Sequence, residues 1–119
     1  STSSAGYWIV LSIEDWNRGE HYPVMYVVKR NGDSLREIGS GTYPDFSPDA
    51  SKIVYEKPNQ GIWIMNRDGS NDHCIVSDSS AKYPAWSPDD TLIAYVSEEK
   101  YGTHIITLTG DSLRFYPTA

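Results

Sequence analysis

The clearest indication of the fold is Tyr83-Pro84-Ala85-Trp86-Ser87-Pro88-Asp89, because this segment repeats an earlier one of the same chain. Forty residues upstream stands Tyr43-Pro44-Asp45-Phe46-Ser47-Pro48-Asp49, with the same tyrosine, prolines, serine and final aspartate. The likeness continues downstream, where Leu92–Tyr95 matches Lys52–Tyr55 at the same shift. Self-similarity at a fixed period of this size indicates an architecture in which each copy is one structural unit.

A second matching segment follows in each copy. Gly61–Gly69 matches Gly102–Gly110, one residue having been added in the loop before it. In a third copy, upstream, Met25–Gly32 aligns with Ile62–Gly69. The chain is therefore a single segment, residues 1–119, with approximate repeats at 1–40, 41–80 and 81–119.

Each copy predicts four short strands. The Tyr-Pro-x-aromatic stretch is a strand with its proline near the start, and it runs into a Ser-Pro-Asp turn whose Asp side chain bonds the backbone ahead. The runs Ile53–Glu56 and Ile62–Met65 carry β-branched and aromatic residues with little helical periodicity. Asn66–Gly69 is a hairpin turn in which Gly69 supplies a positive φ. The predicted fold class is all-β.

A four-stranded unit of this length matches the blade of a β-propeller. Its signature resembles the WD40-like repeat family called PD40, the repeat of TolB-type propellers, and the resemblance implies about three antiparallel blades. The residues that carry this signature, with structural roles, are Pro44, Phe46, Ser47, Pro48 and Asp49 in the second copy and Pro84, Trp86, Ser87, Pro88 and Asp89 in the third. Ala50 and Asp90 stand where the family prefers glycine.

The first copy has no Ser-Pro-Asp turn. Aligning Ile9 with Ile53 places Ser3–Ala5 where that turn would be, so we expect the first blade to lack its inner strand. Propellers close with roughly four to eight blades, and three blades leave two apolar end faces exposed. We therefore expect a closed ring only on oligomerisation, as a dimer with six blades, or else an open filament. The alternative is a fragment of a longer propeller.

Composition excludes several classes of protein. The chain of 119 residues has 16 acidic and 10 basic side chains and a formal charge of −6, so it lacks the basic stripe that nucleic-acid binding needs. Its apolar runs are strand-sized, well short of the roughly 20 residues of a membrane helix, and no membrane insertion is expected. Cys74 is the only cysteine, so neither an intrachain disulfide nor a cysteine-rich metal site can form.

No catalytic, cofactor-binding or metal-ligating constellation stands out, and we expect a non-enzyme without a cofactor. Asn66–Asp72 alternates like a calcium loop, but its glycine comes at the fourth position rather than the sixth, which favours a hairpin turn. Four aspartates lie in or near the inner-strand turns and are expected to cap them, with a shared cation in the central channel as the alternative: Asp45, Asp49, Asp89 and Asp90. His104 replaces Trp63 in the repeat, which favours a packing or surface position over a catalytic base.

A long loop in the first copy breaks the repeat. It brings aromatic side chains together with charged ones, a mixture typical of interaction hot spots. The candidate interaction residues are Trp16, Arg18, His21 and Tyr22. The alternative is that the aromatic side chains fold back on their own blade.

These features predict a non-enzymatic scaffold or protein-interaction module that self-assembles from incomplete propellers, with a protein or peptide as a further ligand. The alternative is an accessory or gating propeller of a larger hydrolase, peptidase or TolB-like protein, whose reactive residues lie elsewhere. TolB-like proteins are commonly exported, and this resemblance alone favours a periplasmic or extracellular location.

Overall fold

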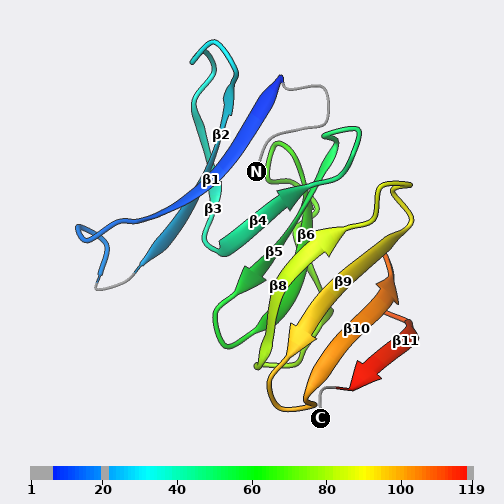
Figure 1. Cartoon of the computed structure of the whole chain (residues 1–119). Helices are drawn as coiled ribbons and strands as arrows, with labels where there is room; N and C mark the ends of the chain where they lie inside the picture. The colour runs from blue at the N-terminus through cyan, green and yellow to red at the C-terminus, as the bar shows by residue number, and fades with distance from the viewer. Residues whose placement is uncertain (1–6, 20–21, 118–119) are drawn as a thin grey trace.

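The computed structural model describes residues 7–19 and 22–117, which form eleven strands in three antiparallel sheets (Figure 1). The first sheet contains β1 (Trp8–Glu14), β2 (Pro23–Lys29) and β3 (Arg36–Gly39). The second contains β4 (Thr42–Phe46), β5 (Lys52–Lys57), β6 (Gly61–Asn66) and β7 (His73–Val76). The third contains β8 (Ala81–Trp86), β9 (Leu92–Ser97), β10 (Gly102–Thr107) and β11 (Ser112–Pro117). For the described residues, the prediction of an all-β chain with three blades, the first with one strand fewer, is confirmed.

Each sheet joins its strands in chain order, and none of the three closes on itself within the described residues. Those residues also contain no helix that could cross a membrane.

Strand pairing confirms the alignment of the three copies. Ile9 lies opposite Val28 in the first sheet, and Ile53 lies opposite Met65 in the second. In the third sheet the same repeat position pairs Ile93 with Ile106. Because residues directly opposite each other share one face of a sheet, a repeat position has the same orientation in all three blades.

The Tyr-Pro dipeptide lies deeper in the inner strands than the sequence suggested. Pro44 is the third residue of β4 and Pro84 the fourth of β8, and both strands slip their pairing register at this point. Tyr43 and Tyr83 have φ of 51° and 57° there. β4 and β8 are edge strands of their sheets. A bulge in an edge strand tolerates proline, because no ladder hydrogen bond is required from the proline nitrogen.

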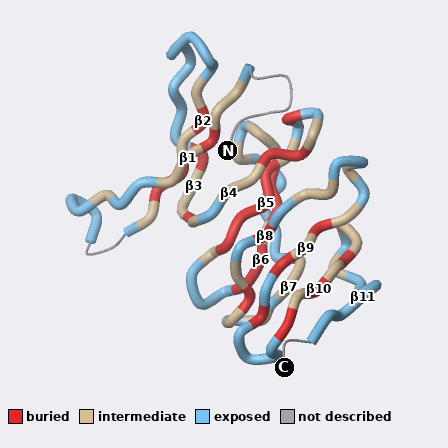
Figure 2. The backbone as a smooth tube through the Cα atoms, viewed as in Figure 1, coloured by how far each residue is buried: buried red, intermediate tan, exposed pale blue. Residues whose placement is uncertain are grey.

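Two apolar clusters join the sheets, one at each junction. The first combines Val10, Met25, Val27 and Ile38 of the first sheet with Phe46, Ala50, Ile53, Tyr55 and Met65 of the second segment. The second combines Val54, Ile62 and Ile64 with Ala81, Ile93, Tyr95 and Ile106. Since side chains alternate along β5, the middle sheet is buried on both faces (Figure 2).

Polar contacts fix how neighbouring sheets sit. The Ser12 hydroxyl donates to the Gly41 carbonyl at 2.7 Å, linking the first sheet to the second. The Trp86 backbone N–H donates to the Asp45 carboxylate at 2.9 Å, linking the third to the second. Each junction therefore has a directional contact beside its apolar cluster.

Candidate interaction surfaces

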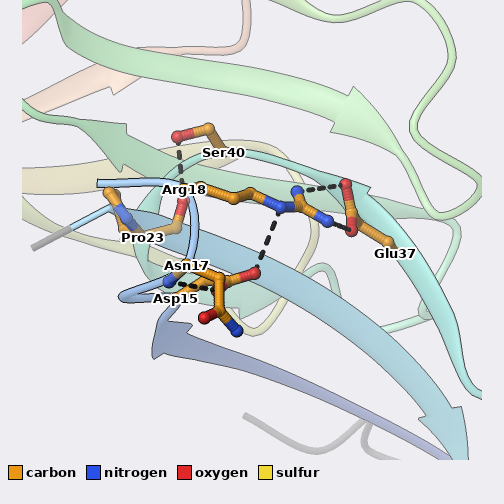
Figure 3. A network of polar contacts seen from close by, with 6 residues as sticks. All are labelled: Asp15, Asn17, Arg18, Pro23, Glu37 and Ser40. Atoms are coloured by element: carbon orange, nitrogen blue, oxygen red, sulfur yellow. Dashed lines mark hydrogen bonds and ion pairs between the residues drawn. The ribbon is translucent and has the colours of Figure 1, made fainter. Parts of the chain in front are cut away.

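The loop between β1 and β2 is held by an ion-pair network (Figure 3). The Arg18 guanidinium donates two hydrogen bonds to the Glu37 carboxylate of β3, at 2.6 and 2.8 Å, and its Nε lies 3.1 Å from Asp15. The Glu37 hydrogen bonds raise the pKa of Arg18, and those from Arg18 lower the pKa of Glu37. A two-point contact of this kind fixes orientation as well as distance.

Three further hydrogen bonds support the same loop. The Asp15 N–H donates to the Tyr22 carbonyl at 2.7 Å, and the Asp15 side chain accepts from the Asn17 N–H at 3.0 Å. The Ser40 hydroxyl donates to the Pro23 carbonyl at 2.8 Å. The loop therefore has a defined base on the first sheet.

The structure places the predicted interaction residues in different situations. Trp16 is 61% exposed and Tyr22 is 39% exposed, so both rings present surface to solvent. Arg18 is engaged with Glu37 and Asp15 and serves to position the loop. His21 lies outside the described residues. The charge pair was hidden from the sequence, because Arg18 and Glu37 are 19 residues apart and belong to a loop and a separate strand.

The Ser-Pro-Asp turns are closed by their own side chains. Asp49 accepts hydrogen bonds from the Ser47 hydroxyl at 2.8 Å and from the Ser51 N–H at 2.9 Å. Asp89 accepts from Ser87 and Thr91 in the same way, at 2.6 and 3.1 Å. Hydrogen bonds from Ser51 and Ser47 lower the pKa of Asp49 to about 2. These carboxylates therefore act as turn caps.

The acidic residue after the third-blade cap lies close to both caps. Burial raises the pKa of Asp90, and the charges of Asp49 and Asp89 raise it further. Even so, no three carboxylate, imidazole or thiol groups among the residues that the structure describes are grouped so as to hold a metal ion.

His104 is a packing residue. Its ring stacks on Tyr95, with 5.0 Å between ring centroids, and lies 4.6 Å from the centroid of Phe115 on β11. Burial lowers the pKa of His104, so the neutral ring is favoured. A neutral imidazole packed between two aromatic rings acts as part of the blade's buried interior.

One end of the molecule exposes a strip that we call the leading face, formed by Ile9, Leu11, Tyr26 and Val28 of the first sheet. All four are partly exposed. The counterparts of Ile9, Leu11 and Val28 in the second sheet are Ile53, Tyr55 and Met65, and all three are buried against the first sheet. The leading face is thus the surface that a preceding blade covers elsewhere in the chain.

The opposite end exposes a strip that we call the trailing face, formed by Ala94, Val96, Thr103 and Ile105. These residues are partly or well exposed. The counterparts of Ala94, Thr103 and Ile105 in the second sheet are Val54, Ile62 and Ile64, and all three are buried against the third sheet. The number of blades predicted two exposed end faces from the sequence, and the burial of individual residues now identifies which side chains form them.

The described residues thus form three successive blades of a β-propeller. The fold is that of TolB-like propellers, as the repeat signature predicted.

Comparison with solved structures supports this assignment. A TolB candidate from Agrobacterium tumefaciens is 18% identical, with a TM-score of 0.79 over 99% of this chain and 45% of that one. TolB from Acinetobacter baumannii is 16% identical, with a TM-score of 0.74 over 95% and 30%. The β-propeller domain of the trilobed protease from Pyrococcus furiosus is 17% identical, with a TM-score of 0.71 over 92% and 39%. The chain therefore spans less than half of each protein.

Neither a protein-family model nor a curated protein matches the sequence.

Proposed function

We propose that the chain is a non-enzymatic β-propeller scaffold or protein-interaction module that self-assembles through its end faces. The observation that carries this proposal is the difference in burial between equivalent positions. Ile53 and Met65 are buried against a neighbouring blade, whereas Ile9 and Val28, at the same repeat positions, are partly exposed. Covering both end faces removes apolar surface from water, which is the main favourable term in association.

Blade number sets the size of the assembly. Propellers close with roughly four to eight blades, so two copies of three blades supply a ring of six. If the rotation between copies does not close the ring, the same contact produces a filament. A partner of any other kind would have to present a blade-like apolar face.

The loop between β1 and β2 is the proposed recognition element for a protein or peptide. Its base is fixed by the Arg18–Glu37 pair, and Trp16 and Tyr22 present aromatic surface. A pre-ordered loop loses less conformational entropy on binding than a flexible one.

The test of self-assembly is the mass of the purified chain measured by light scattering over a range of concentrations. We expect a species of about 27 kDa, twice the 13.4 kDa of one chain, or a larger series if a filament forms. A folded chain that stays at the mass of one copy at every concentration would contradict the proposal.

The second candidate function is an accessory or gating propeller within a larger peptidase or TolB-like protein. It is favoured by the likeness to the propeller domain of the Pyrococcus furiosus protease, of which this chain spans 39%. In that case the end faces pack against further blades of one polypeptide. An isolated chain that is monomeric and poorly folded supports this candidate.

A non-enzymatic role predicts no turnover of ester or peptide substrates. Turnover that is lost when one Ser or His is substituted would contradict it. A periplasmic or extracellular location stays a prediction from the resemblance of the motif.

A further inference from the structure

We infer that two copies meet head to tail, the trailing face of one against the leading face of the other, in the register of the two blade junctions within the chain. This inference rests on the proposed function, because it names the surfaces and the register through which self-assembly occurs. It is argued from contacts that recur at both internal junctions.

The first recurring contact is made by a hairpin-turn glycine. A Cβ placed on Gly69 would lie 2.8 Å from the Ile38 carbonyl oxygen, on the outer strand of the preceding sheet. A Cβ on Gly110 would overlap the carbonyl oxygen of Ile75, again on the preceding outer strand. Gly32 holds the same place in the first sheet, yet a Cβ there would meet nothing within 4 Å. Within the described residues the space beside the Gly32 turn is therefore open, whereas each of the two later turns lies against the preceding outer strand.

The surface that would receive this turn is found on β11. Ile38 and Ile75 each follow their turn glycine by six residues, and Tyr116 follows Gly110 by the same number. Tyr116 lies opposite Thr103, so its side chain is on the trailing face, and it is 54% exposed.

One local difference separates β11 from the other outer strands. The pairing of β10 with β11 slips between Ile105 and Ile106, whereas the slip in the second sheet falls between Ile62 and Trp63. The bulge of β11 therefore comes earlier in the strand. As a result, the partner copy's turn meets a tyrosine side chain where the internal junctions present a bulged isoleucine.

The second recurring contact is apolar. Val27 and Met65 belong to one buried cluster, and Ile64 and Ile106, at the same repeat positions, belong to the other. The third pair in this series is Ile105 of one copy and Val28 of the next. Both are partly exposed in the single chain, so the head-to-tail contact would complete a third cluster of the same kind.

The pattern also selects against pairing of like faces. Both internal junctions join a face of the trailing type to a face of the leading type, and no junction joins two of one type. A contact between different surfaces is heterologous, and it closes only if the rotations add up to a full turn. Two copies with three blades each would supply six blades, a number within the range at which propellers close.

The test uses two charge variants of the whole chain, Val28→Glu on the leading face and Ile105→Arg on the trailing face. Each alone places an unpaired charge in the seam, which is strongly unfavourable, and we expect association to weaken about tenfold or more. An equimolar mixture of the two is expected to regain the two-chain mass. In the mixed pair one seam is unchanged on both sides, and the other brings opposite charges together.

Matched controls carry the same charge changes away from the end faces. Gln60→Glu and Thr109→Arg alter exposed residues in turns, and both are expected to associate like the unchanged chain. Circular dichroism reports whether each variant is folded. If a charge variant is unfolded, Val28→Thr and Ile105→Thr replace it, because threonine is compatible with a strand and still weakens apolar contact.

The outcomes separate the seam from the proposed function. Loss of association in both folded variants with recovery in the mixture supports the head-to-tail seam. Loss in only one variant indicates pairing of like faces, and loss in both without recovery indicates another contact. Each of these two results overturns the seam and leaves self-assembly in place. A single-chain mass for the unchanged protein overturns the proposed function itself.

Discussion

Replacing Gly110 by alanine tests whether the hairpin turns hold neighbouring blades together. Gly110 has a φ of 92°, and a Cβ there would overlap the Ile75 carbonyl oxygen of the preceding blade. Gly32 occupies the same turn of the first blade with a φ of 89°, and a Cβ there would meet nothing within 4 Å. The two glycines share the backbone conformation and differ in the contact, so each serves as the control for the other.

The expected losses follow from these two contributions. An alanine in the left-handed region costs about 1–2 kcal/mol of unfolding free energy, and this cost applies at both positions. Forcing a methyl group into a packed contact adds about 1–3 kcal/mol; this applies at Gly110 and, with less overlap, at Gly69, but not at Gly32. We therefore expect about 1–2 kcal/mol for Gly32→Ala and about 2–5 kcal/mol for Gly110→Ala, with Gly69→Ala in between.

The assay is urea unfolding followed by tryptophan fluorescence, at a protein concentration low enough for the single chain to predominate. At concentrations where the chains associate, the loss of unfolding free energy caused by Gly32→Ala should be larger, since the Gly32 turn then has a neighbour. Equal losses for Gly32→Ala and Gly110→Ala at the lowest concentration would refute the role of the turn contact. Full stability of Gly110→Ala would do the same.

Three further variants test individual groups. Burial raises the pKa of Glu56, whose Oε1 accepts no hydrogen bond from the described residues. Because the folded state disfavours the ionised Glu56, this residue lowers the unfolding free energy as the pH rises above its unfolded pKa of about 4. Glu56→Gln should therefore raise the unfolding free energy at pH 7, and the increase should disappear near about pH 4. Asp90 has a φ of 67° and lies near two other carboxylates. Asp90→Gly relieves about 1–2 kcal/mol of left-handed strain and costs about 0.5–1 kcal/mol in chain entropy, so the unfolding free energy should rise by about 0.5 kcal/mol and the thermal midpoint with it. An unchanged midpoint would contradict this. Arg18→Gln should speed hydrogen exchange in residues 15–19 without moving the global midpoint, whereas unchanged exchange would show that the ion pair does not order the loop.

The repeat explains how much of the fold could be predicted from the sequence. The matching stretches that end in Asp49 and Asp89 mark the inner strands and turns, and the alignment of Ile9 with Ile53 locates β1 within its blade. These features are local or periodic, so one copy informs the others. The position of the inner-strand bulge was missed, because it depends on how Tyr43 and Tyr83 pair with the next strand.

The candidate surfaces were less accessible to sequence analysis. Trp16 and Tyr22 were identified because the loop interrupts the repeat, but the partner of Arg18 depends on where the loop meets β3. Apolar residues occur both on the end faces and at the buried junctions. Ile105 and Ile64 cannot be told apart by type, and only the presence of a following blade decides that one is buried and the other is not.

The bulged inner strands also have a consequence for solubility. β4 and β8 are edge strands of their sheets. The unpaired backbone N–H and C=O groups of an edge strand can pair with another polypeptide and start amyloid-like growth. In β4 and β8 a proline and a left-handed tyrosine interrupt the row of these groups, and the Trp86 amide is already occupied by Asp45. These two edge strands are therefore poor templates for the growth of a fibril.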